Sequence, residues 1–497
     1  MSKKWKLIVA IVLVLSVAGF IFAGKEKKAD KKKEEKVLAP ESAEEDEKVS
    51  QGVVAGSAEV LPTEDELRAA MLPSLKKLGK GKTIRILFQG GGDSDTPVRL
   101  KEFIENEVGL KITVDIVPPQ QMHERQVMSL MGGSYEYDLI ETYPTYIGEY
   151  ADAGFLENLD KWYEKYGDEI DVTDYIEKAQ VGFNKYKGSW YAIPYDGDVL
   201  LLYYRQDLFD DPENKADFKA GYGYELDAPE TWNQVKDFAE FFDNKFPDMR
   251  GMGMLGSKHW LTVDYWVTIY RNYLTAKEIP YENGLVNDFG VIELNKEAFF
   301  ASNKMWMDLL KLAPDDILSW GYAESKEAIN VGRIPMTMQW ASAVFRDPRQ
   351  SEYWDVINAV VMPGFKKADG SVEHVTSLAV GKAMTIPAAA KNGEVAFLYA
   401  SYLSTKTVQI YATNSGSGVD PNRYSVWEDQ RVRDVWGPLY KPTLESLDLG
   451  ISDIKVPQAS KLYEAILVPL HSTWAGDMTT EEAWESTIKE FKKIMSE

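Results

Sequence analysis

The chain has 497 residues, of which 44% are hydrophobic, and this is too long for a single hydrophobic core. Its formal net charge of −22 argues against a nucleic-acid partner, because phosphate binding needs basic patches. The absence of cysteine excludes disulfides, thiolate metal sites and a lipid anchor on an N-terminal cysteine. We therefore expect two lobes with separate cores.

The first 24 residues predict a signal peptide or a membrane anchor. Lysines at positions 3, 4 and 6 precede an apolar run from Leu7 to Phe22, which ends in Ala23-Gly24. The run is shorter than the roughly 20 residues of a spanning helix, but flanking lysines can snorkel, so both interpretations stay open. Residues 25–62 are rich in Lys, Glu, Ala and Ser and predict a disordered charged tether, with a solvated helix as the alternative.

The folded part begins with alternating strand and helix patterns. Thr83–Phe88, Ile112–Val117 and Tyr137–Ile140 have the β-branched and aromatic composition of strands, and amphipathic helical patterns lie between them. This order is typical of an α/β fold with a mostly parallel sheet and right-handed crossovers.

The loops after these strands predict a ligand-binding edge. Ligands of open α/β sheets bind beyond the carboxyl ends of the strands, which places Gly91, Asp93, Glu141 and Tyr143 on one rim. The glycine run at 90–92 lets the backbone approach a ligand closely. It is not a GxGxxG motif, so we exclude a nucleotide site.

The stretch Lys187–Pro212 contains two strand-like segments separated by a polar gap. The first segment breaks at Pro194, the gap follows as Tyr195-Asp196-Gly197-Asp198, and the second segment continues from Val199 to Tyr204. A strand tolerates proline and two carboxylates only where it leaves the sheet, because an unpaired buried charge is very costly. We therefore expect Tyr195, Asp196 and Asp198 to line a crevice.

The sequence YAIPYDGDVLLLYYRQDLF, followed by DAPETWNQVKDFAEFF, resembles the sugar-binding, maltose-binding-protein-like branch of the solute-binding proteins of ABC importers. YADAGFLENLD and PNRYS are similar to further signatures of that family. The resemblance implies a two-lobed periplasmic-binding-protein-like α/β fold, in which each lobe has a mostly parallel sheet flanked by helices and three segments cross between the lobes. The implied boundaries are 63–194 and 379–418 for lobe 1, and 195–378 and 419–497 for lobe 2.

The resemblance also implies ligand contacts in a cleft between the lobes. Trp260, Trp320 and Trp340 lie near the ends of apolar runs and are candidates for stacking on sugar rings, with core packing as the alternative. Ser377 lies in the second crossing, where relatives often carry Gly-Gly-Trp. Arg423, in the third crossing, either donates to the ligand or forms an ion pair between the lobes.

Catalytic motifs are not evident. Asp196 and Asp198 could suggest a glycosidase, but residues two apart on an extended strand face the same way and are poor candidates for flanking one bond. The sequence has no GxSxG motif, and its four histidines do not have HExxH spacing. We predict no enzymatic activity, no cofactor and no metal.

The resulting hypothesis is an extracytoplasmic substrate-binding protein. The resemblance implies that it captures an oligosaccharide or related polyol and delivers this carbohydrate ligand to the membrane-embedded permease subunits of an ABC transporter. We expect a monomer in the periplasm or at the cell surface, exported by its N-terminal segment. An extracellular carbohydrate-active enzyme and a surface carbohydrate adhesin are the alternatives.

Overall fold

The computed structural model describes residues 60–132, 135–287, 289–341, 351–378 and 381–497. The chain divides into residues 1–52 and 53–497, and the fold below belongs to the second unit. The predicted signal peptide or anchor and nearly all of the predicted tether lie outside the described residues. Within the described ranges, no helix combines the length and apolar character needed to cross a membrane.

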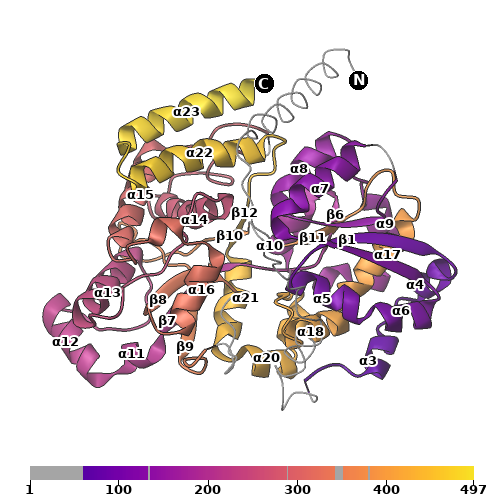
Figure 1. The fold of residues 1–497 in the computed structure, drawn as a ribbon, viewed down its shortest axis with the longest axis horizontal. Coiled ribbons are helices and arrows are strands. Elements are labelled where there is room, and N and C mark those ends of the chain that lie inside the picture. The colour runs from indigo at the N-terminus through magenta and orange to yellow at the C-terminus, as the bar shows by residue number, and fades with distance from the viewer. Residues whose placement is uncertain (1–59, 133–134, 288, 342–350, 379–380) are drawn as a thin grey trace, which may run out of the picture. The chain divides into compact units, whose positions relative to one another are not determined.

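A five-stranded sheet organises the first half of the fold (Figure 1), with the strand order β2-β1-β3-β11-β6. Its strands are β1 (Thr83–Gln89), β2 (Lys111–Val117), β3 (Leu139–Thr142), β6 (Ala192–Pro194) and β11 (Ala383–Thr385). β1 is parallel to β2 and β3, which confirms the strand-helix alternation predicted from the sequence. β11 is antiparallel to both β3 and β6, so this sheet is mixed.

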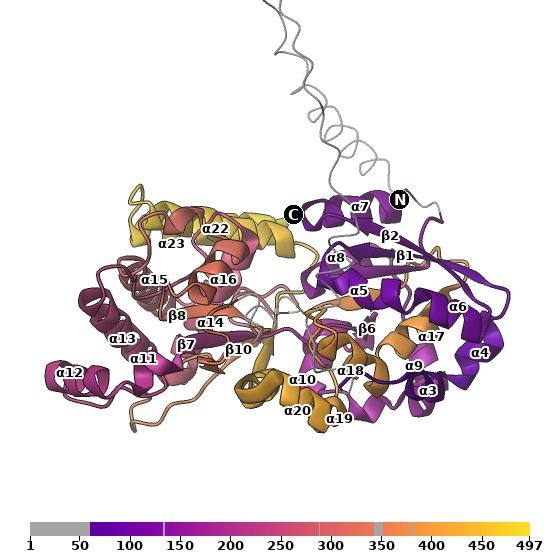
Figure 2. The same ribbon diagram turned by 60° about the horizontal axis from the view of Figure 1, so that its bottom comes forward.

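Helices cover both faces of this sheet. Figure 2 shows α7 on one side of β1 and α17 on the other, and both helices pack on strands of the sheet. The helices of this half are α3 (Glu64–Ala69), α4 (Pro73–Gly79), α5 (Gly92–Arg99), α6 (Lys101–Val108), α7 (Pro119–Met131), α8 (Pro144–Asp152), α9 (Asp160–Ile170), α17 (Gly393–Leu403) and α18 (Lys406–Asn414).

The glycine run after β1 differs from its prediction as a loop. Gly91 has a φ of 119°, which only glycine adopts readily, and this turn allows α5 to begin at Gly92. Asp93 therefore lies in the first turn of a helix, where the helix dipole favours a carboxylate. The helical segment between β1 and β2 is divided into α5 and α6, which meet at Leu100.

A three-stranded sheet organises the second half, with the order β8-β7-β9. Its strands are β7 (Leu200–Arg205), β8 (Met336–Trp340) and β9 (Ile357–Val361). The expectation of a mostly parallel sheet in this lobe is wrong, because β7 is antiparallel to both neighbours. β7 runs away from the crossing at Tyr195–Val199, and β8 and β9 both run back toward it. Neither pairing therefore needs the right-handed crossover of a parallel unit.

The second half is otherwise helical and has its own large core. Its main helices are α11 (Gln206–Asp210), α12 (Pro212–Tyr222), α13 (Trp232–Lys245), α14 (Trp260–Ala276), α15 (Lys296–Leu310), α16 (Tyr322–Asn330), α19 (Tyr424–Trp427), α20 (Gln430–Trp436), α21 (Tyr440–Asp448), α22 (Ala459–Trp474) and α23 (Thr480–Ser496). Capping boxes begin α13, where Thr231 pairs with Gln234, and α23, where Thr479 pairs with Glu482.

Three segments connect the two halves, as predicted. The first runs from β6 to β7, and the second runs from β10 (Thr376–Leu378), which pairs with β12 (Gly450–Ser452), to β11. The third follows α18 and leads to α21, which packs on β7 and β9. The residue boundaries proposed for the two lobes stay a prediction.

Candidate ligand site

The three crossing segments meet at Asp196 and Gly197. The backbone N–H of Asp196 donates to the Lys382 carbonyl at 2.9 Å, and the N–H of Lys382 donates back to the Asp196 carbonyl at 3.0 Å. The N–H of Gly197 donates to the Asp420 carbonyl at 2.9 Å, which attaches the third crossing. A Cβ on Gly197 would lie 2.9 Å from the Pro421 carbonyl oxygen, so a side chain there would disturb this junction.

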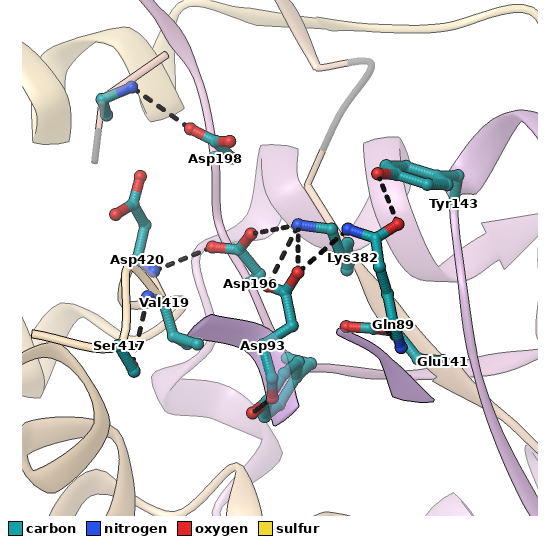
Figure 3. Close-up of polar contacts among 12 residues, drawn as sticks. Gln89, Asp93, Glu141, Tyr143, Asp196, Asp198, Lys382, Ser417, Val419 and Asp420 are labelled. Carbon is teal, nitrogen blue, oxygen red and sulfur yellow. Dashed lines mark hydrogen bonds and ion pairs between the residues drawn. The ribbon is translucent and has the colours of Figure 1, made fainter. Parts of the chain in front are cut away.

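Five carboxylates and one ammonium are buried around this junction (Figure 3), and none of the six residues is more than 8% exposed. They come from α5, β3 and all three crossings. We call them the acidic cluster: Asp93, Glu141, Asp196, Asp198, Lys382 and Asp420.

Lys382 compensates part of this charge. Its Nζ lies 3.0 Å from Asp93 and 3.4 Å from Asp196 Oδ2. Asp196 Oδ1 also accepts the backbone N–H of Asp420 at 2.8 Å, and Asp93 Oδ2 accepts from Gln89 Nε2 at 3.2 Å. Burial disfavours the charge on Lys382, but Asp93 and the other acidic groups around it hold its pKa well above the ordinary value. The ammonium therefore stays charged between Asp93 and Asp196.

The other carboxylates have few donors. Asp198 Oδ1 accepts the backbone N–H of Ala341 at 3.2 Å, and Glu141 Oε2 accepts that of Gln89 at 2.8 Å. Both carboxylate oxygens of Asp420, and Oε1 of Glu141, have no hydrogen-bond partner among the described residues. Such acceptors are costly when buried, unless a ligand supplies donors.

Burial raises the pKa values of these acids. The pKa of Asp196 rises to about 6, because burial outweighs the opposing effect of Lys382. Burial, together with Asp196, holds the pKa of Asp198 well above its ordinary value, and burial with Asp198 does the same for Asp420. Burial and Asp93 raise that of Glu141. The cluster therefore favours proton uptake when no ligand is bound.

Aromatic rings lie next to this cluster. Tyr143 donates its hydroxyl to Gln89 Oε1 at 3.0 Å, and the ammonium of Lys382 lies 5.6 Å from its ring centre. Trp260, the half-buried first residue of α14, meets the Tyr143 ring edge-on at 5.5 Å between centroids. Tyr322, the first residue of α16, is 40% exposed, and both burial and nearby Asp198 raise the pKa of its hydroxyl.

The remaining predicted tryptophans are buried. Trp340 ends β8 as expected, but it is 2% exposed and packs edge-on against Tyr265 at 5.5 Å. It belongs to the core of the second half, and its Nε1 has no hydrogen-bond partner among the described residues. Trp320 is also 2% exposed and lies under the Arg333 guanidinium at 5.4 Å. The Trp320 side chain is thus packed in the core of the second half.

The side chains of Tyr195 and Ser377 both form hydrogen bonds within the protein. The Tyr195 hydroxyl donates to the Asp93 carbonyl at 2.5 Å, which ties α5 to the first crossing. Ser377 is fully buried, and its Oγ contacts Thr268 Oγ1 and Arg271, each at 2.8 Å. Both side chains are thus occupied by contacts within the protein.

Of the two roles considered for Arg423, the ion pair is present. Its guanidinium lies 3.4 Å from Asp174 Oδ2 and donates to the carbonyls of Ile170, Asp171 and Ser404 at 2.6 to 2.7 Å. Arg423 also borders a pocket of about 310 Å³, whose lining includes Glu169 and Lys406 and no residue of the acidic cluster. Its contacts hold the third crossing in place.

Sequence reasoning did not select three residues of this region. Lys382 is the one charged residue in the segment GKAMTIP, and such an isolated lysine before a buried strand is a signal for a buried ion pair. Asp420 immediately precedes the PNRYS signature. Tyr322 carries no sequence signal, because only the folding of α16 toward the crossing brings it near Asp198.

Comparisons with known proteins identify the family of the chain. The sequence profile described as "Bacterial extracellular solute-binding protein" matches residues 92–410. The erythritol/L-threitol-binding protein of Mycolicibacterium smegmatis is 22% identical over 404 residues, which cover 76% of this chain and 78% of that protein. The mannitol-binding protein of Pseudomonas aeruginosa is 22% identical over 459 residues, 86% of this chain and 97% of that protein.

Solved structures confirm the fold class. A solute-binding protein of Agrobacterium radiobacter in complex with ribitol superposes with a TM-score of 0.69 at 17% identity, covering 84% of this chain and 99% of that one. Maltose-bound MalE3 of T. maritima gives a TM-score of 0.68 at 17% identity, covering 83% and 100%. The predicted two-lobed α/β fold is therefore confirmed.

Proposed function

The chain belongs to the family of bacterial extracellular solute-binding proteins, and from this premise we propose that it binds a sugar or polyol at the acidic cluster. It delivers this ligand to the permease subunits of an ABC transporter. The family places its work outside the cytoplasm. In our proposal the segment Leu7–Phe22 directs export, and the protein acts as a monomer.

The observation that carries this proposal is the set of unpartnered acceptors where the three crossings meet. Both carboxylate oxygens of Asp420 and Oε1 of Glu141 are buried without donors among the described residues. Each hydroxyl of a sugar or polyol can donate one hydrogen bond, so a ligand of this class supplies several donors in a compact volume. The names of the relatives support the same class, since they include binding proteins for erythritol, mannitol and maltose.

Aromatic surface supports the proposal as well. Sugars present C–H groups on one face and hydroxyls at the edge, and flat rings cover the former. Half-buried Trp260 and exposed Tyr322 begin helices of the second half and lie near Tyr143 and Asp198, respectively. We propose that these two rings, rather than Trp320, meet the ligand.

Binding without turnover is part of the proposal. The relatives are binding proteins, and the carboxylates of the cluster are tied to three backbone crossings that a two-lobed receptor uses as hinges. Incubation with oligosaccharides should release no new reducing ends. Sustained release that Asp198→Asn abolishes would support the enzyme alternative.

A thermal-shift screen followed by calorimetry tests the proposed function. The panel contains polyols of four to six carbons, monosaccharides and maltooligosaccharides. A ligand at about 100 times its Kd should stabilise the protein by about 2.7 kcal/mol. Asp198→Asn should weaken binding at least tenfold, whereas Asp315→Asn, on an exposed carboxylate of the second half, should leave it unchanged. The proposal fails if no member of the panel binds.

A further inference from the structure

The charge of the acidic cluster is far from balanced. It contains five carboxylates and one ammonium, and Lys382 lies against Asp93 and Asp196. No other lysine or arginine in the described part of the chain forms an ion pair with the cluster. Within the described ranges, therefore, no lysine or arginine pairs with Asp198, Asp420 or Glu141.

Asp198 and Asp420 form the least compensated pair. Both side chains are buried where the first and third crossings meet, because the backbone of Asp420 is bound to Asp196 Oδ1 and to the N–H of Gly197, the residue before Asp198 (Figure 3). Asp198 receives one backbone N–H, from Ala341, and neither oxygen of Asp420 has a partner among the described residues. Two facing carboxylates in a buried place need a proton or another cation between them.

A neutral side chain beside this pair is also left without partners. Asn422 is fully buried, and neither its Oδ1 nor its Nδ2 has a hydrogen-bond partner among the described residues. Its Oδ1 would lie 3.2 Å from a Cβ on Gly197, so the amide packs against the residue that separates Asp196 from Asp198. Buried amides without partners are rare in native proteins, and this one is an independent sign that a polar ligand completes the region.

We propose that the ligand carries a protonated amine, and that Asp198 and Asp420 bind this amine between them. The inference rests on the proposed function and narrows it to amine-bearing sugars or polyols. An ammonium has three N–H donors and a full positive charge, so one group can satisfy both carboxylates. A hydroxyl supplies one donor and leaves the charges uncompensated.

A metal ion is a less suitable occupant. No three of the described histidine, aspartate and glutamate side chains are arranged so that they could hold one. The hydroxyls of the same ligand remain available to Glu141 and Asn422, whose unpartnered atoms lie outside the Asp198–Asp420 pair.

Binding is coupled to proton release. In the empty protein the pair retains a proton, and the ammonium replaces that proton when it binds, so the proton leaves to solvent. The groups that face the pair are Asp196, Lys382 and Asp93 from the first half, and Tyr322, Tyr203 and Tyr265 from the second. Among these facing groups Lys382 is the one cation. Affinity should fall as the pH is lowered, because protons then compete with the amine for the pair.

Matched probes test the inference. The full chain is titrated with sorbitol and 1-amino-1-deoxysorbitol, and with glucose and glucosamine, by calorimetry at pH 7.5. In at least one pair the amine-bearing member should bind at least tenfold tighter than the neutral member. Repeating the tighter titration in two buffers of different ionisation enthalpy should show release of about one proton. Affinity should be at least tenfold lower at pH 5.

Variants separate the amine preference from general binding. Asp420→Asn should reduce the preference to less than about threefold, and Asp198→Asn provides the same test if that variant does not fold. Asp315→Asn should retain the full preference. If neutral members bind as well as or better than their amines, the inference is wrong while the proposed function stands. If no member of either pair binds, and the wider panel also fails, both are wrong.

Discussion

The third crossing contributes to two buried charged regions, through Arg423 and through Asp420, and the regions differ in how fully their polar atoms are hydrogen-bonded. Around Arg423, the guanidinium contacts three carbonyls and Asp174, and it stacks on the Tyr175 ring at 3.9 Å. Asp174 in turn accepts from the backbone and hydroxyl of Ser425. In the acidic cluster, by contrast, carboxylate oxygens of Asp420 and Glu141 are left without donors.

The difference distinguishes structural charge from functional charge. A buried ion pair with all its hydrogen bonds made contributes to a single native arrangement, and removing one partner is costly. A buried acidic group without donors costs stability in the empty protein and is compatible with folding only if something else compensates it. We infer that the contacts of Arg423 stabilise the crossing segments, and that the acidic cluster binds a ligand.

The largest predicted effect concerns the satisfied region. Arg423→Ala should lower the free energy of unfolding by about 3–5 kcal/mol, because it removes the donor of the buried Ile170 and Ser404 carbonyls and the cation that pairs with Asp174. Arg431→Ala is the matched control, since its pairs with Asp429 and Glu66 are partly exposed, and it should cost about 1 kcal/mol or less. Urea denaturation measures both. Equal losses in the two variants would contradict the distinction.

Two tryptophans, one in the core and one beside the acidic cluster, allow the same comparison. Trp320→Ala removes a core ring and should cost about 3–5 kcal/mol of stability without a specific loss of affinity in the folded protein. Trp260→Ala removes a half-buried ring beside Tyr143 and should weaken ligand binding at least tenfold at a smaller cost in stability. Calorimetry and thermal melting of both variants check this. The assignment is wrong if Trp260→Ala binds like the unmodified chain.

The pH dependence of the empty protein reports on the acidic cluster. The pKa of Asp196 is raised to about 6 in the folded state, so protonation of Asp196 favours the folded protein. This contribution to stability is complete below the ordinary pKa of an aspartate, and it is lost as the pH rises through 6. Asp198 and Asp420 are shifted in the same direction. The melting temperature without ligand should therefore fall between pH 5 and pH 8. A rise over that range would show that these carboxylates are compensated.

The smallest predicted effect is a gain. Asp420→Asn keeps the shape of the side chain and removes an uncompensated charge, so the empty variant should melt about 1–3 °C higher at pH 8. The gain should shrink at pH 5, where the unmodified cluster holds more protons. Asp315→Asn should show no gain at either pH. A destabilised Asp420→Asn protein at pH 8 would mean that the charge is structurally required.

The sequence predicted the first half of the fold better than the second. Helical segments lie between β1, β2 and β3 in the sequence. Connections long enough to contain a helix are typical of crossovers between parallel strands, so the parallel pairing of these three strands was predictable. The antiparallel order β8-β7-β9 could not be predicted, since it depends on where β8 and β9 return in space. The first crossing was recognisable from Pro194 and the carboxylates after it.

The candidate site was only partly predictable. Three of its carboxylates lie after a strand or in a gap between strands, namely Asp93, Asp196 and Asp198. A charged side chain at such a position is unusual, and the sequence alone therefore selected these residues. Lys382 and Asp420 join them through backbone pairing between crossings that are far apart in the sequence. Trp340 was expected at a strand end, but its burial against Tyr265 depends on how α14 packs, which local sequence does not specify.

A crystal structure of the full chain with the tightest-binding compound of the screen tests the central claim most directly. We predict that the ligand lies within hydrogen-bond distance of Asp198 and Asp420, with the Arg423 contacts unchanged. A ligand bound elsewhere, such as in the pocket that Arg423 borders, with the acidic cluster still without donors, would contradict the account.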